Sequence, residues 1–151
     1  MHNSHLYTFN EAKKLLDEKV FLYICQNGLK DSGMFTLLER REIAHQFYGI
    51  PYEDIVILDS YEAIRNAIEG ATWIVRGVRS LNDYEEISRL IVFYDIEDFR
   101  SKLVTINIPM ELREISSSRL ISRIKEGDKF GVVSWASLQV VQLIQEKLFL
   151  R

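Results

Sequence analysis

The chain has 151 residues, of which 47% are hydrophobic and 27% are charged, and its formal net charge is −3. This length and apolar content predict one globular domain, over residues 1–151, with a continuous core. The acidic balance argues against a nucleic-acid binder, and the lack of a long apolar run argues against a membrane partner.

Helical and strand patterns alternate along the chain. Thr36 and Glu39 have the spacing of a capping box, Gly70 follows a helical pattern, and Pro109 follows a strand pattern. In chain order the expected elements are helix 8–18, strand 20–25, helix 36–47, strand 55–58, helix 61–68, strand 73–75, helix 83–99, strand 103–108, and helices 117–125 and 134–148.

This alternation predicts the fold class. Strands separated by helices form right-handed βαβ crossovers, so we expect an α/β fold with a Rossmann-like, doubly wound parallel sheet. In such sheets a ligand lies across the carboxyl ends of the strands. Antiparallel pairing among the four expected strands would contradict this prediction.

The single cysteine, Cys25, ends the first strand pattern. It cannot form an intrachain disulfide, and residues 1–5 lack the basic and apolar regions of a signal peptide. Both observations predict a cytoplasmic protein.

The segment Arg76-Gly77-Val78-Arg79 follows a buried-strand pattern. Guanidinium groups bind phosphate oxygens in bidentate fashion, and glycine allows the backbone to come close, so the segment predicts a nucleotide or phosphorylated substrate. Surface ion pairs with Asp83 or Glu85 would explain the two arginines in another way.

Four segments, spread over nearly the whole chain, form one larger pattern. They are His2-Asn3-Ser4-His5; Met34-Phe35-Thr36-Leu37-Leu38-Glu39-Arg40-Arg41; Ile74-Val75-Arg76-Gly77-Val78-Arg79 with Asp83-Tyr84-Glu85; and Ile115-Ser116-Ser117-Ser118. In order and approximate spacing they resemble phosphopantetheine adenylyltransferase, of the nucleotidyltransferase superfamily. The resemblance implies adenylyl transfer from ATP to 4'-phosphopantetheine, giving dephospho-coenzyme A and pyrophosphate in coenzyme A biosynthesis.

The resemblance also implies partners. The expected ligands are ATP and 4'-phosphopantetheine or coenzyme A, with Mg²⁺ carried by ATP and no metal site on the protein itself. The expected assembly is a homo-oligomer, a hexamer in the family.

Roles for single residues follow from the resemblance. His5, Lys30 and Arg79 would be the catalytic groups that position and neutralise phosphates, while Lys30 and Arg76 would bind the acceptor's phosphate. The implied nucleotide-binding residues are His5, Gly77, Val78, Arg79, Glu86, Ile115, Ser116, Ser117 and Ser118.

Simpler explanations stand beside several of these roles. Lys30 could be an ordinary loop lysine, and Glu86 could stabilise the dipole at a helix N-terminus. Helix capping alone would explain one or two of the serines. His2 is expected to be a solvated terminal residue.

The chain departs from the family at its amino terminus. The family has a central strand and a Gly-x-Phe-Asp-Pro loop before the histidine motif, whereas here Met1 directly precedes that motif, and Ser4 replaces its glycine. We therefore expect four strands, ordered around a gap or a substitute. Three alternatives follow: an impaired or inactive nucleotide- or coenzyme A-binding homologue, a transferase with another acceptor or with CTP, and a true start upstream of Met1.

Overall fold

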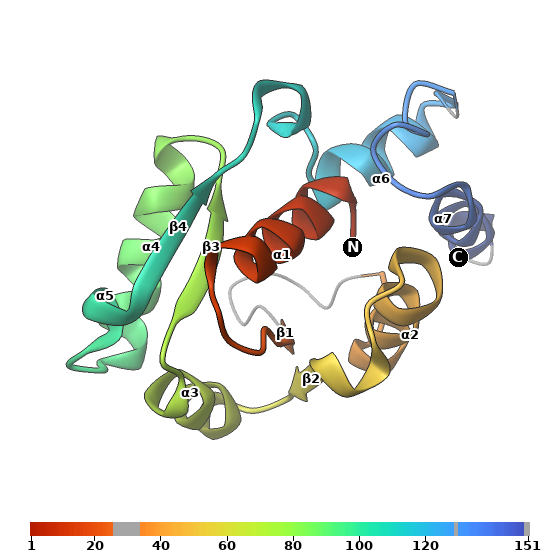
Figure 1. Cartoon of the computed structure of the whole chain (residues 1–151). Coiled ribbons are helices and arrows are strands. Elements are labelled where there is room, and N and C mark those ends of the chain that lie inside the picture. Colours follow the sequence, from red (N-terminus) through yellow and green to blue (C-terminus); the bar gives the residue numbers. More distant parts are fainter. Residues whose placement is uncertain (26–33, 129, 150–151) are drawn as a thin grey trace.

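A computed structural model describes residues 1–25, 34–128 and 130–149 of the chain (Figure 1). In chain order the elements are α1 (Asn3–Leu15), β1 (Leu22–Cys25), α2 (Leu37–Tyr48), the 3-10 helix η1 (Tyr52–Asp54), β2 (Ile55–Leu58), α3 (Tyr61–Gly70), β3 (Ile74–Val78), α4 (Leu81–Tyr94), α5 (Phe99–Lys102), β4 (Leu103–Asn107), the 3-10 helix η2 (Met110–Leu112), α6 (Ser117–Lys125) and α7 (Leu138–Phe149). None of the described helices is both long and apolar enough to cross a bilayer.

The four strands form two parallel pairs. β1 pairs with β2, with Leu22 opposite Ile55, and β3 pairs with β4, with Ile74 opposite Leu103. Within the described residues the two pairs do not join into one sheet. The α/β class with parallel strands is confirmed, and the strands fall into two groups, as expected for an order around a gap.

Helices cover both pairs (Figure 1). α1 and α4 lie on opposite sides of the β3–β4 pair, and α2 packs on the β1–β2 pair. One buried cluster joins α1 to the β1–β2 pair: Phe9, Ile24, Ala44, Ile50 and Ile55. Another joins α2, α6 and α7: Ile43, Leu120, Ile124, Val132, Ala136, Val140, Val141 and Ile144.

Local capping fixes α2 as the sequence predicts. The Thr36 hydroxyl accepts a hydrogen bond from the Glu39 backbone N–H at 3.2 Å, and the Glu39 carboxylate accepts one from the Thr36 N–H at 2.7 Å. The helix ends at Gly49, whose φ of 66° is left-handed and so favours glycine.

Two boundaries near the candidate site differ from the prediction. α1 begins at Asn3 and not at residue 8, because the Asn3 N–H donates to the Trp135 carbonyl at 2.9 Å and its amide donates to the Ser134 carbonyl at 2.8 Å. β3 continues past residue 75, because its ladder with β4 places Arg76 opposite Thr105.

Two further boundaries differ in the second half. α4 ends at Tyr94 and not near residue 99, because Asp95 takes a left-handed conformation with φ of 49°. α7 begins at Leu138 and not at residue 134, since Ser134 and Trp135 lie in the preceding turn.

Candidate functional site

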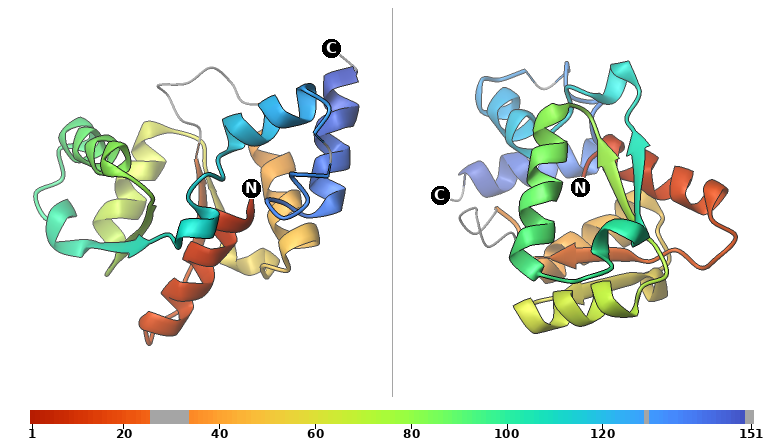
Figure 2. Two further views of the ribbon diagram at one scale, coloured as in Figure 1. Left: turned by 90° about the horizontal axis from the view of Figure 1, so that it is seen from above. Right: turned by 90° about the vertical axis from the view of Figure 1, so that its left-hand side faces the viewer.

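The amino end of α1 lies near Arg79 at the carboxyl end of β3, and Arg79 in turn contacts the segment before α6. Asn3 fastens α1 to residues 134 and 135, and Arg79, directly after β3, donates to the Ile115 carbonyl directly before α6. In both views of Figure 2 the amino end of the chain, marked N, lies near the middle of the molecule. The expected location of a ligand at the carboxyl end of parallel strands coincides with this junction.

Two histidines stack at the amino end of α1. The rings of His2 and His5 lie 3.8 Å apart between centroids, with 19° between their planes. His2 is only 2% exposed, so its expected place as a solvated terminal residue is wrong. The buried Nδ1 of His2 has no hydrogen-bond partner among the described residues. The spacing of three residues, which places both side chains on one helix face, is the sequence signal that could have found His2.

The charges around this pair are positive. Burial lowers the pKa of His2 to about 2, and His5, the α-ammonium of Met1 and Arg79 lower it further. Desolvation, the α-ammonium of Met1, Arg79 and Arg76 lower the pKa of His5 to about 3. Both imidazoles are therefore neutral near pH 7, in a positive field that favours an arriving anion.

Burial of neutral His2 predicts acid sensitivity. The pKa of a free histidine, 6.5, exceeds that of folded His2, about 2, so the unfolded chain takes up the proton first and stability falls as the pH drops below 6.5. We expect the His2 contribution to fall by about 2–3 kcal/mol between pH 6 and pH 4. Urea unfolding at both pH values measures it, with His2→Gln as the variant without the titrating group. Equal losses in the two proteins would contradict the prediction.

The Arg79 side chain is held by three hydrogen bonds to two residues. Its Nε and one terminal nitrogen donate to the Asp83 carboxylate at 3.2 and 2.9 Å, and the other terminal nitrogen donates to the Ile115 carbonyl at 3.0 Å. Burial opposes ionisation of Asp83, but the hydrogen bonds from Arg79 outweigh it and lower the pKa of that carboxyl. The ion pair with Asp83 considered from the sequence is therefore present, and it orients Arg79.

Arg76 differs from Arg79 in both place and contacts. It lies within β3, not after it, and its side chain is exposed. Within the residues that the structure describes it makes no hydrogen bond or ion pair. Because Arg76 also lowers the pKa of His5, its charge acts on the same site.

The two residues between the arginines are packed. Val78 is 3% exposed, and its carbonyl accepts from the Ile108 N–H at 2.9 Å. A Cβ at Gly77 would overlap the Thr8 hydroxyl of α1 and lie 3.0 Å from the Ile108 Cδ1. Gly77 thus allows α1 to lie close against β3; the predicted contact of both residues with a nucleotide stays a prediction.

The serine segment forms the start of α6. Ile115 is buried, and the Ser116 hydroxyl caps the helix by accepting from the Arg119 N–H at 3.2 Å. Ser117 and Ser118 are exposed in the first turn, where helix N–H groups lack intrahelical partners. Capping accounts for Ser116, while the other two are available to a ligand.

Two predicted site residues are not brought to this junction by any described contact. Glu86 is half-buried on α4 and makes no hydrogen bond or ion pair among the described residues. Lys30 lies outside the residues that the structure describes.

The chain matches one protein family. The family model described as cytidylyltransferase-like matches residues 1–123, a span that contains the histidine pair, Arg79 and the serine segment. A search of curated proteins finds no match for the chain. Because the matched span covers most of the chain, the chemistry indicated is nucleotidyl transfer, and the chain belongs to the cytidylyltransferase-like family of the nucleotidyltransferase superfamily.

Proposed function

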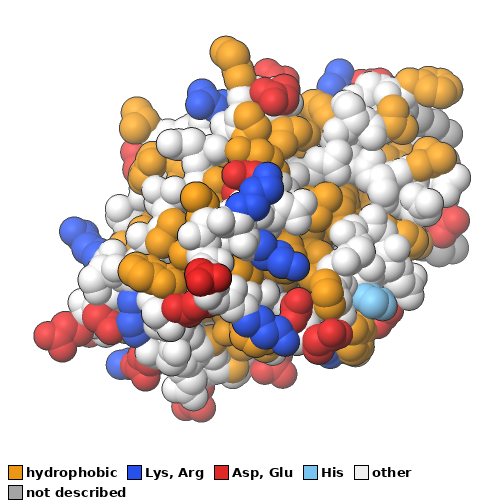
Figure 3. Space-filling view, in the orientation of Figure 1, with side chains coloured by type: hydrophobic (Ala, Val, Ile, Leu, Met, Phe, Trp, Pro, Cys, Tyr) orange, Lys and Arg blue, Asp and Glu red, His pale blue; other side chains and the backbone are white. Residues whose placement is uncertain are grey.

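We propose that the protein transfers an adenylyl group from ATP to 4'-phosphopantetheine, giving dephospho-coenzyme A and pyrophosphate. The observation that carries the proposal is the cluster of His2, His5, Arg76 and Arg79, in which the positive charge of Arg79 acts on both histidines. A cluster of this kind suits a ligand with several phosphates. On the face that carries α1, basic, acidic and hydrophobic side chains are mixed (Figure 3).

Arg79 and His5 would stabilise the leaving pyrophosphate. An arginine has five N–H donors, and Arg79 uses three of them on Asp83 and Ile115, so two remain for phosphate oxygens. Because these contacts already orient the guanidinium, little side-chain entropy is lost when the nucleotide binds. His5 would donate an imidazole N–H, and the nearby phosphate charge would raise its pKa.

Arg76 would bind the acceptor. Its side chain is exposed and is not held by the described residues, so it can reach a phosphate that enters from solvent. The acceptor phosphate oxygen then attacks the α-phosphorus of ATP in line, and the bond to pyrophosphate breaks. No general base is needed, since the attacking phosphate is already ionised.

Mg²⁺ would be held by the phosphates of the nucleotide. The described residues contain no group of three or more histidine, cysteine or carboxylate side chains suited to a metal. Asp83, the carboxylate beside Arg79, is already occupied by that arginine. The donors here are N–H and hydroxyl groups, which fit phosphate oxygens and not the ion itself.

A second candidate uses CTP in place of ATP, with another phosphorylated acceptor. The match to the cytidylyltransferase-like family is the observation that favours it. The contacts proposed above are to phosphates and leave the base unspecified, so both nucleotides would fit the same cationic cluster.

A pyrophosphate-release assay with ATP or CTP, with and without 4'-phosphopantetheine, tests the proposal. We expect release only with ATP and the acceptor together. His5→Ala should lower kcat by about 10²- to 10³-fold, as loss of a donor to developing charge does elsewhere. Lys14→Ala, on the far end of the same helix, should leave the rate unchanged.

Two outcomes would contradict the proposal. Nucleotide binding in a thermal-shift assay without any pyrophosphate would identify a binding homologue. Release with CTP and not with ATP would favour the second candidate.

A further inference from the structure

Asn3 makes two hydrogen bonds to a turn near the other end of the chain. It is the first residue of α1, where a backbone N–H has no partner within the helix. This N–H donates to the Trp135 carbonyl at 2.9 Å, and the side-chain amide donates to the neighbouring Ser134 carbonyl at 2.8 Å. Within the described part of the chain, the side chain of His2, the N-cap residue, makes no capping hydrogen bond. Asn3 therefore fixes the start of the helix in place of a capping side chain.

The two acceptor carbonyls belong to a well-packed turn. Val132 and Ala136, on either side of them, are buried, and the Trp135 N–H donates to the Val132 carbonyl at 2.9 Å. The Arg123 guanidinium lies over the Trp135 ring, 4.9 Å from its centroid, and pairs with the Asp128 carboxylate at 2.8 Å. The buried backbone and the covered aromatic ring keep the acceptors of the Asn3 hydrogen bonds in one place.

The turn of α1 that Asn3 fixes also carries the histidine pair. His2 directly precedes Asn3, and the His5 N–H donates to the His2 carbonyl at 2.9 Å. The two stacked rings, 3.8 Å apart, are thus attached to the backbone that Asn3 holds. Side-chain directions follow the helical backbone, so a shift of this turn would move both rings.

From these contacts we propose that Asn3 is a positioning residue for the His5 imidazole. Its amide is engaged by the Ser134 carbonyl, so Asn3 acts through His5 and not on the ligand. The proposal rests on the role in the proposed function that His5 has toward the leaving pyrophosphate. Misplacement of a catalytic group by about 1 Å can cost about a hundredfold in rate. We therefore expect Asn3→Ala to lower kcat by about ten- to a hundredfold and to leave the KM for ATP within about twofold.

A double-mutant cycle in the pyrophosphate-release assay tests how Asn3 acts. In the His5→Ala background, Asn3→Ala should change kcat by less than about twofold, because the group that Asn3 positions is already absent. Asn3→Gln keeps an amide donor and should recover part of the rate. An equal fall of kcat with and without His5, or an Asn3→Ala variant as active as the parent protein, would overturn the proposal.

Nuclear magnetic resonance of the histidine rings gives a test that needs no turnover. Stacking on His2 should shift the ring protons of His5 upfield, and this shift should be lost in Asn3→Ala. The third histidine, His45 on α2, should keep its signals in the same variant. If the parent protein releases no pyrophosphate, the proposed function fails, and the histidine signals alone decide the positioning role. Unchanged signals of His2 and His5 in Asn3→Ala would overturn it.

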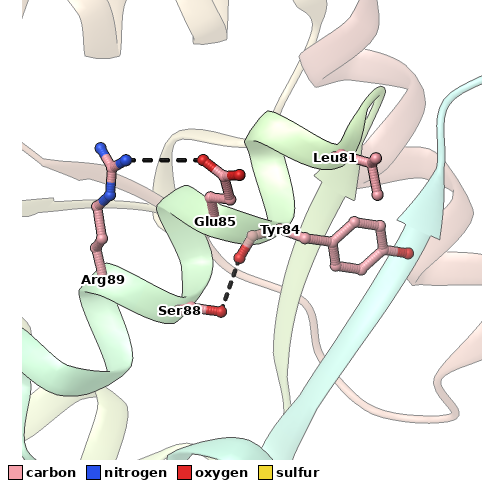
Figure 4. A pocket seen from close by; sticks show the side chains of 5 residues that line it. All are labelled: Leu81, Tyr84, Glu85, Ser88 and Arg89. Atoms are coloured by element: carbon pink, nitrogen blue, oxygen red, sulfur yellow. Dashed lines mark hydrogen bonds and ion pairs between the residues drawn. The ribbon is translucent and has the colours of Figure 1, made fainter.

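Ser88→Ala is the matched control. The Ser88 hydroxyl donates to the Tyr84 carbonyl at 3.0 Å, so this variant also removes one exposed hydrogen bond from a side chain to a carbonyl (Figure 4). Ser88 lies on α4, on the opposite side of the β3–β4 pair from α1. Its loss should leave both kcat and the histidine signals as in the parent protein. A fall of kcat like that of Asn3→Ala would show a general effect and would overturn the proposal.

Discussion

Replacement of Arg79 by alanine is expected to weaken both folding and nucleotide binding. The guanidinium joins the Asp83 carboxylate to the Ile115 carbonyl, and hydrogen bonds to charged groups contribute about 1.5–3 kcal/mol. Because the Asp83 side chain is only 15% exposed, its charge would lose its partner in a partly desolvated place. We expect chemical denaturation to show a loss of about that size, and calorimetric titration to show ATP affinity lower by about ten- to a hundredfold.

Arg76→Ala is the matched control for this experiment. Arg76 carries the same charge a few residues away, but it is exposed and makes no hydrogen bond or ion pair in the described part of the chain. Its loss should leave the free energy of unfolding within about 0.5 kcal/mol of the parent value and weaken only the binding of 4'-phosphopantetheine or coenzyme A. Equal stability losses in the two variants would show that the hydrogen bonds of Arg79 to Asp83 and Ile115 contribute nothing specific to the free energy of unfolding.

Gly77→Ala is expected to destabilise the protein by about 1–3 kcal/mol, the usual cost of overpacking. The new Cβ would overlap the Thr8 hydroxyl, which is held in place by a hydrogen bond of 3.0 Å to the Ser4 carbonyl. Alanine loses less backbone entropy on folding than glycine does, which stabilises the variant by about 0.5–1 kcal/mol. This gain is too small to offset the cost of overpacking. Thermal or urea unfolding measures the change.

Two further variants separate overpacking from other effects. Thr8→Ala removes the overlapping oxygen, so in that background the cost of Gly77→Ala should fall by at least half. Gly70→Ala, where a Cβ would meet nothing within 4 Å, should be neutral or stabilising. An unchanged cost in the Thr8→Ala background would mean that the close packing of α1 on β3 is not what requires glycine.

The sequence predicted the elements whose signals are local. The capping box of Thr36 and Glu39 marked the start of α2, and the apolar run 55–58 is β2 residue for residue. The parallel class followed from the alternation of elements, which the pairing of β1 with β2 and of β3 with β4 confirms.

The features of the fold and the site that the sequence did not predict depend on contacts between residues far apart in the chain. No local signal marks Asn3 as the first residue of α1, because its partners are the carbonyls of Ser134 and Trp135. The ion pair of Arg79 with Asp83 could be anticipated from its spacing, but the bond to the Ile115 carbonyl could not. The roles of the predicted site residues toward nucleotide and acceptor stay predictions.

The hydrogen bonds from Asn3 to residues 134 and 135 influence the order in which the parts of the chain fold during synthesis. The ribosome makes the histidine pair more than a hundred residues before the anchor that holds the amino end of α1. Contacts of such long sequence separation form late, because a large loop must close before they contribute. The site residues nearest the start of the chain should therefore reach their final arrangement among the last, when α7 docks on α2 and α6.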